Sequence, residues 1–184
     1  MKYVVAENYL CFMALLEMII EDSIGIRISQ RDLAEEFSVT VPVDYVTDIK
    51  NVKYSSVEND YGVQVTEKKL QSFFNKNKLE LSVKYIDGIH INELELDERF
   101  AKYLKEEKYV IFAHSYGSLY NKENCNNLGH VALLENIIRD GVVQIYDPGP
   151  DEAGIKQVNI LKIYDAMRIK GGIYIIDKNI TYSI

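Results

Sequence analysis

Helix-type patterns and strand-type patterns occupy different halves of this sequence. Over residues 1–78 the apolar positions recur mainly at helical spacing, whereas strand-like runs predominate over 79–184. Helices followed by antiparallel strands are typical of an α+β domain in which the two kinds of element are segregated. The length of 184 residues suits one such domain. We therefore predict a single domain over 1–184, with a mainly helical half over 1–78 and a mainly sheet half over 79–184.

Three helices are expected in the first half. Residues 11–22 are apolar on most faces and rich in helix formers, which predicts a buried helix. Asn8 is the nearest residue suited to cap the start of that helix, and Ser29 is suited to cap a second one. A third helix is expected over 66–75. Residues 39–60 contain a proline and have no clear period, so we expect an irregular segment there that can include a short strand.

The second half is expected to form mainly strands. Strict alternation of apolar and polar residues predicts a half-buried strand over 79–86. Asp140-Gly141 between two apolar runs is a strong signal for a hairpin. The expected strands are 79–86, 108–112, 131–138, 142–146 and 172–177, with short helices at 96–106 and 161–167.

Charge and composition exclude several classes of partner. A net charge of −7, without any lysine- or arginine-rich stretch, is unsuited to nucleic acid or to anionic membranes. No apolar run approaches the ~20 residues that span a bilayer, and the first residues lack a signal-peptide pattern, so we expect no membrane insertion. Two cysteines are too few for a disulfide framework, which predicts a cytoplasmic setting. Neither a zinc-type spacing nor a glycine-rich phosphate loop is present, so we expect no metal and no cofactor.

Cys11 stands at the start of the first predicted helix. A thiol is an effective nucleophile only as the thiolate, and both the positive end of a helix dipole and a nearby imidazolium favour that form. Cys11 is placed for the first of these effects. The alternative is structural, because a free cysteine on an apolar helix is usually a small core residue.

His130 and Asp147 lie at the outer ends of the predicted hairpin. His130 begins one strand and Asp147 closes the next, so a carboxylate could orient the imidazole through a hydrogen bond. A two-residue turn at 140–141, however, places His130 opposite Asp151. His130 and Asp147 then meet only if the loop is longer or a bulge intervenes. Each residue also has a structural interpretation when it is considered alone. Asp147 could be an ordinary turn residue, and His130 could be a histidine at the surface end of a strand.

The order of these three features resembles the papain-like cysteine peptidases. It is most similar to the domain that removes double-glycine leaders in bacteriocin-exporting ABC transporters, and to its stand-alone relatives. The matching segments are Asn8-Tyr-Leu-Cys11 with its helix, Ile28–Leu33, Tyr61–Phe74 with the strand to Ile86, Leu128–Leu133, and Val142–Pro148. The resemblance implies a papain-like α+β fold in which Cys11 is the nucleophile, His130 the base and Asp147 the orienting acid.

Two residues depart from that family's pattern. The family usually has a glutamine about six residues before the cysteine to stabilise the oxyanion, and here this region is Val4-Val5-Ala6. The residue after the cysteine is usually glycine, and here it is Phe12. The backbone N–H of Cys11 could supply one oxyanion donor, and Asn8 is the only side-chain amide nearby.

Two further sites have both a functional and a structural interpretation. His114-Ser115, after the strand at 108–112, could line a cleft, but a solvated strand-end pair is the simpler expectation. Cys125 lies near His130 in sequence and could be a second thiol close to the site, but a plain loop cysteine is the simpler expectation.

Three functions follow from these residues. The first is a cysteine hydrolase that acts on a peptide or amide bond through an acyl-enzyme. The second is an acyltransferase on the same fold that passes the acyl group to an amine, resembling those that take acyl groups from carrier proteins. The third is a non-catalytic binding domain that has lost the oxyanion amide. The expected partner is accordingly a peptide or an acyl-carrier-type substrate, and the acidic charge favours a basic or neutral one.

Overall fold

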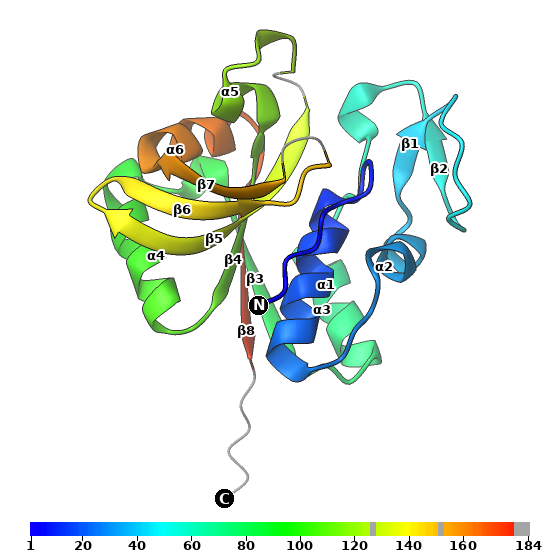
Figure 1. Ribbon diagram of the computed structural model, residues 1–184, viewed down its shortest axis with the longest axis horizontal. Helices are drawn as coiled ribbons and strands as arrows, with labels where there is room; N and C mark the ends of the chain where they lie inside the picture. The colour runs from blue at the N-terminus through cyan, green and yellow to red at the C-terminus, as the bar shows by residue number, and fades with distance from the viewer. Residues whose placement is uncertain (126–127, 151–152, 179–184) are drawn as a thin grey trace, which may run out of the picture.

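The computed structural model describes residues 1–125, 128–150 and 153–178, with helices gathered in the first half and an antiparallel sheet in the second (Figure 1). The chain therefore has the α+β organisation that the sequence predicts. The helical half comprises α1 (Cys11–Ile24), α2 (Gln30–Phe37), β1 (Thr40–Pro42), β2 (Lys53–Ser55), the 3₁₀ helix η1 (Glu58–Asp60) and α3 (Glu67–Lys76). No helix in the described ranges is long and apolar enough to cross a bilayer.

The second half is built around one six-stranded antiparallel sheet. Its strands are β3 (Leu81–Asp87), β4 (Tyr109–Ser115), β5 (Gly129–Arg139), β6 (Val142–Asp147), β7 (Gly154–Asn159) and β8 (Gly172–Lys178). They are arranged in the order β3-β8-β4-β5-β6-β7. Helices α4 (Leu96–Lys105), α5 (Tyr116–Tyr120) and α6 (Ile160–Ile169) and the 3₁₀ helices η2 (Gly88–His90), η3 (Glu93–Glu95) and η4 (Glu123–Cys125) connect them.

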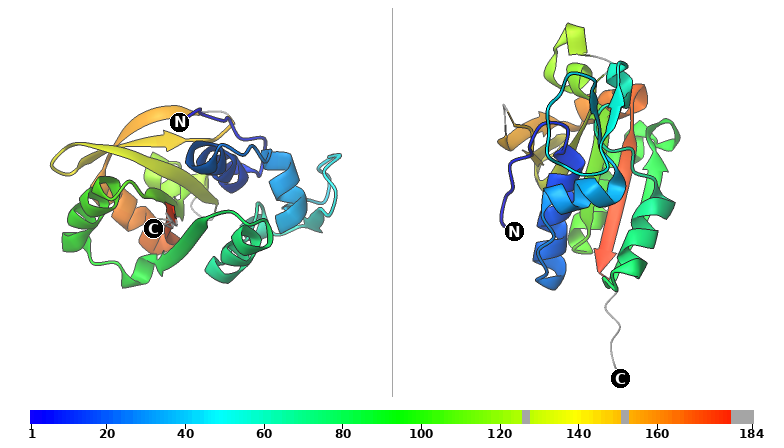
Figure 2. Two further views of the ribbon diagram at one scale, coloured as in Figure 1. Left: turned by 90° about the horizontal axis from the view of Figure 1, so that it is seen from below. Right: turned by 90° about the vertical axis from the view of Figure 1, so that its right-hand side faces the viewer.

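The two faces of the sheet pack against different helices. Residues Ile111, Leu133 and Tyr174 face the cluster that contains α1. Their strand neighbours Phe112 and Leu134 face the cluster that contains α4 and α6. Successive side chains of a strand point to opposite faces, so these strands are buried on both sides. Figure 2 shows α1 between the sheet and α2, with α4 and α6 on the other side.

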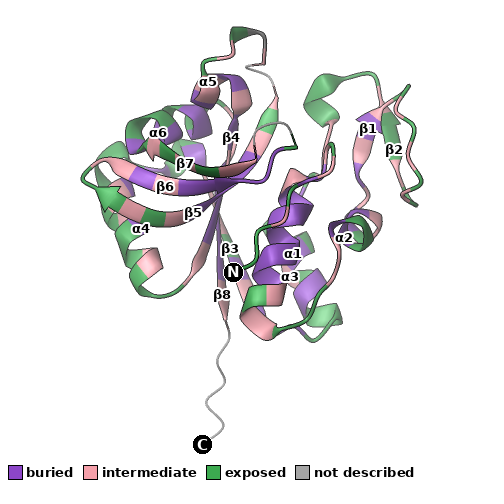
Figure 3. Ribbon diagram, viewed as in Figure 1, coloured by how far each residue is buried: buried purple, intermediate pink, exposed green. Residues whose placement is uncertain are grey.

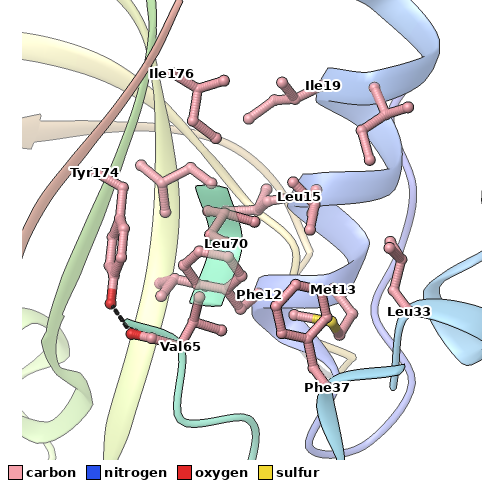
Figure 4. Close-up of a cluster of buried hydrophobic side chains, with 14 of the residues drawn as sticks. Phe12, Met13, Leu15, Ile19, Leu33, Phe37, Val65, Leu70, Tyr174 and Ile176 are labelled. Carbon is pink, nitrogen blue, oxygen red and sulfur yellow. Dashed lines mark hydrogen bonds between the residues drawn. The ribbon is translucent and has the colours of Figure 1, made fainter. Parts of the chain in front are cut away.

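Helix α1 is the centre of the first cluster. Residues 12–20 are all buried, and they form the buried middle of α1 in Figure 3, whereas its last turn is partly exposed. The ring of Phe12 packs edge-to-face on Tyr174, with 5.0 Å between ring centroids, and the Tyr174 hydroxyl donates to the Val65 carbonyl at 2.6 Å (Figure 4). A helix that is apolar all round must be enclosed, and here the sheet, α2 and α3 enclose it.

Several local expectations differ from the structure. Ser29 caps α2 as predicted, since its hydroxyl accepts from the N–H of Asp32. The prediction that Asn8 caps α1 is wrong: Leu10 occupies the N-cap position, and no side chain in the described ranges caps that helix. Strand β7 was not anticipated. Its alternating half-buried and exposed residues fit an edge strand, which has a weaker sequence pattern than a central one.

Leu15 of α1 tests the packing against the sheet. The side chain of Leu15 is fully buried, so Leu15→Ala should lower the free energy of unfolding by about 2–5 kcal/mol, through lost apolar burial and the cavity left behind. Urea denaturation followed by circular dichroism measures this change. Leu161→Ala in α6 is the matched control, because Leu161 is 48% exposed and its truncation should cost less than about 1 kcal/mol. Equal losses for the two variants would contradict the described core.

Candidate active site

Cys11 is the first residue of α1, at a helix end that no side chain in the described ranges caps. The first backbone bond of the helix runs from the N–H of Ala14 to the carbonyl of Leu10. The N–H groups of the first three helical residues therefore point beyond the helix end. Asn8 is exposed in the turn just before the helix. Its role as an oxyanion donor stays a prediction.

The segment before Cys11 is hydrogen-bonded to the sheet. We call residues 4–7 the strap. The Tyr146 hydroxyl donates to the carbonyl of Val4 at 3.0 Å, and the N–H of Ala6 donates to the carbonyl of Pro148 at 2.7 Å. Tyr146 lies on β6 and Pro148 follows that strand directly. The strap thus fixes the start of α1 beside the end of β6.

The strap is equally bound to the helical half. The Gln30 side chain donates to the carbonyl of Val5 at 3.0 Å and accepts from the N–H of Glu7 at 2.8 Å. Buried Glu17 of α1 accepts from the N–H of Gln30 at 2.8 Å. Val5 lies near the position where the resemblance would place an oxyanion glutamine. Gln30 does not replace that glutamine, because its amide group holds the strap.

The hairpin register decides whether Asp147 can reach His130. Arg139 pairs with Val142 across the turn, as the sequence predicts. Uninterrupted pairing would place Asp147, five residues after Val142, opposite Leu134, five residues before Arg139. At about 3.3 Å per residue, Asp147 would then lie about 13 Å along the strand from His130.

Two bulges in β5 remove this separation. They lie at 134–136 and 137–139, and together they bring Asp147 opposite Ala132. Residues 130 and 132 share one face of β5, so Asp147 becomes a diagonal neighbour of His130. A single bulge would have turned the two side chains to opposite faces, whereas two bulges restore a common face.

His130 and Asp147 form a buried hydrogen-bonded pair. The Nε2 of His130 donates to Oδ1 of Asp147 at 2.7 Å, and the N–H of Gly149 donates to the same oxygen at 2.8 Å. Burial alone would raise the pKa of Asp147, but hydrogen bonding and the charge of His130 hold it well below its usual range. Asp147 is therefore an anion, and it fixes the imidazole ring through Nε2.

The imidazole of His130 also interacts with Cys11. Burial of the ring disfavours its charged form, but hydrogen bonds with Asp147 and with the Cys11 side chain outweigh this effect and raise the pKa of His130 to about 9. Because Nε2 is bound to Asp147, Nδ1 is the nitrogen left for the thiol. Cys11 is a free, partly buried thiol. The structure thus brings Cys11, His130 and Asp147 together from α1, β5 and β6.

His114 is not the solvated strand-end residue that the sequence suggested. Strand β4 continues through Ser115, and both His114 and Ser115 are fully buried. Burial and the charge of His130 lower the pKa of His114 to about 3, so the ring is neutral at physiological pH. Its Nδ1 lies 3.4 Å from the carbonyl of Phe112, and its Nε2 has no partner among the described residues. The uncharged ring of His114 packs edge-on against the ring of His130, with 5.5 Å between the ring centroids.

Two residues that the sequence did not single out also contact the site. Tyr120 of α5 and Lys156 of β7 both donate to Oδ2 of Asp147, Lys156 at 3.1 Å. Neither spacing nor motif marks them, because they lie in elements that the sequence did not predict. Cys125 lies in η4, and its backbone carbonyl accepts from the N–H of Leu128 at 3.0 Å. Both cysteines are free thiols.

Comparison of the chain with models of protein families and with curated protein sequences finds no match. The geometry of the site is therefore the main basis for a functional proposal.

The pKa values of the two site histidines, His130 and His114, should differ by several pH units. NMR of the imidazole C–H resonances should show His130 titrating near pH 9, with His114 uncharged above about pH 5. The Cys11→Ala variant removes one hydrogen bond from His130, so the His130 midpoint should fall. Cys125→Ala is the matched control and should leave that midpoint unchanged. A His130 midpoint near 6.5 in the wild type would contradict the described contacts.

Proposed function

We propose that the chain is a papain-like cysteine hydrolase that cleaves a peptide or amide bond through Cys11. The observation that carries the proposal is that one imidazole, His130, interacts with both the thiol of Cys11 and the carboxylate of Asp147. This is the arrangement of nucleophile, base and orienting acid that covalent acyl transfer uses. The segregation of helices and antiparallel sheet supports the same family resemblance.

The chemistry proceeds in two stages. At rest His130 already holds the proton of the Cys11 thiol as an imidazolium, and the thiolate attacks the carbonyl carbon of the substrate. His130 returns the proton to the leaving amine, the carbon–nitrogen bond breaks, and an acyl-enzyme remains. Water, deprotonated by His130, then attacks the thioester and releases the acid. Asp147 keeps the imidazole oriented throughout and stabilises its charged form.

Backbone groups at the start of α1 are suited to stabilise the tetrahedral intermediate. The uncapped N–H of Cys11 could donate to the developing oxyanion, and the positive end of the helix dipole favours negative charge at the same place. Phe12 replaces the glycine of the resembling family, and its side chain packs into the core against Tyr174. The proposal also includes the cytoplasmic setting predicted from the cysteine count, since the nucleophile must remain a free thiol.

Alkylation by iodoacetamide tests the proposal. In a Cys125→Ser background at pH 6, Cys11 should react about tenfold or more faster than a model peptide thiol, because an imidazolium stabilises its thiolate. The His130→Ala variant should abolish this advantage. His90→Ala is the matched control, because His90 is exposed and remote in sequence from the site. Mass spectrometry of the labelled protein over time gives the rates.

Labelling of Cys11 no faster than the model thiol would contradict the hydrolase and favour the binding domain. If labelling is fast, acyl-enzyme turnover with an added amine gives the second readout. Release of free acid supports the hydrolase, whereas an amide product would replace it with the acyltransferase.

A further inference from the structure

All four acceptor positions of the Asp147 carboxylate are occupied, although orienting His130 requires only one. Oδ1 accepts from His130 and from the N–H of Gly149. Oδ2 accepts from the Tyr120 hydroxyl and from the Lys156 ammonium, the latter at 3.1 Å. A carboxylate has about four lone-pair sites, so this one has no freedom to rotate. Its side chain is 1% exposed.

Tyr120 and Lys156 also contact each other. The ammonium of Lys156 lies 4.4 Å from the centroid of the Tyr120 ring, in cation–π geometry. The Tyr120 ring packs edge-on against Tyr116, and the Tyr116 ring packs against His130, with 5.4 Å between centroids. Contacts therefore extend from Lys156 to His130 by two routes, one through the Asp147 carboxylate and one through the edge-on contacts of the Tyr120 and Tyr116 rings.

Strand pairing fixes the approach of Lys156. In the ladder between β6 and β7, Lys156 is the partner of Ile145. Residues 145 and 147 share one face of β6, so the Lys156 side chain extends diagonally over Asp147. The side chain is 24% exposed, so the ammonium is partly shielded from water. Its interaction with the buried carboxylate is consequently stronger than that of a surface ion pair.

The charges around His130 determine what this ammonium does. Asp147 accepts a hydrogen bond from the ring, and both Asp147 and Cys11 favour its protonation. His114 of β4 is neutral at physiological pH. Tyr116 and Tyr120 of α5 add uncharged rings. Among the described residues, Lys156 is the cation bonded to the Asp147 carboxylate, and it therefore opposes protonation of the imidazole. Two further cations lie nearby, Lys122 over the Tyr116 ring and Lys170 beside Gly129.

We infer that Lys156 and Tyr120 are positioning residues: together they fix Asp147 through Oδ2, and the charge of Lys156 limits the pH range over which His130 stays protonated. The inference rests on the proposed hydrolase for its catalytic meaning. Asp147 and Cys11 make the imidazole basic enough to hold a proton at neutral pH, and the nearby cation lowers that basicity so that the proton is released more readily to the leaving amine.

NMR titration of His130 in the full-length chain tests the role of the charge. Lys156→Met removes the cation, so the His130 midpoint should rise by about one pH unit, since one charge close to a partly buried imidazole is worth on the order of 1 kcal/mol. Lys156→Arg retains the charge and should bring the midpoint back toward the wild type. Lys102→Met in α4 is the matched control, since Lys102 is 68% exposed and its loss should not move the midpoint.

A second readout is alkylation of Cys11 by iodoacetamide at pH 6. Loss of the ammonium removes positive potential near the thiolate, so Lys156→Met should react several-fold more slowly than Lys102→Met. Tyr120→Phe removes a hydrogen bond but no charge, and should slow labelling with a smaller shift of the His130 midpoint. Should Lys156→Met fail to fold, Lys156→Gln removes the same charge and serves in its place.

The two proposals fail in different ways. Slow labelling of the wild-type Cys11 would refute the hydrolase but would leave the His130 titration interpretable. A His130 midpoint that is the same in folded Lys156→Met and in the wild type would refute the electrostatic role of Lys156, whatever the activity. Equal shifts in Lys156→Met and Lys156→Arg would assign the effect to packing and would also overturn the inference.

Discussion

The strap at residues 4–7 is the constraint on which the site depends. Cys11 belongs to the helical half and His130 to the sheet half, so their contact requires the two halves to be held in register. The strap is bound to the sheet through Tyr146 and Pro148 and to the helices through Gln30. Because α1 begins four residues after the strap, these bonds determine where its first turn lies. Apolar packing of α1 orders the core, but it is non-directional and would tolerate small shifts that the site would not.

Burying the Asp147 carboxylate is energetically costly, and the structure offsets this cost with hydrogen bonds to both of its oxygens. An ionised carboxylate as buried as Asp147 is stable only when donors surround it. Its donors come from β5, α5, β7 and the loop after β6. The two bulges of β5 serve the same end, because without them Asp147 would be too far from His130. Irregularities of this kind next to a site are features that position side chains.

Much of this could be predicted from the sequence, because the decisive signals were local. The periodicity of 11–22, the cap at Ser29 and the turn at 140–141 all gave the correct element. The order of cysteine, histidine and aspartate suggested the site residues that the structure brings together. The register of the hairpin could not be predicted, since bulges depend on packing across the sheet rather than on local composition.

The remaining differences have the same physical origin. His114 and Ser115 were expected in solvent because polar residues after an apolar run usually end a strand, whereas tertiary packing buries them. Lys156 and Tyr120 had no motif, because their role arises only from strand pairing and from a short helix. Asn8 failed as a cap because the chain enters α1 through a turn in which Leu10 occupies the N-cap position.

The central claim is that the Cys11 thiol and the His130 imidazole face each other across the junction of the two halves. A crystal structure of the free protein near pH 7 measures the distance from Sγ of Cys11 to Nδ1 of His130 directly. The account predicts a separation of about 3–4 Å, with Nε2 bound to Asp147. A thiol turned into the core, or an imidazole that meets Asp147 without approaching the sulfur, would contradict it.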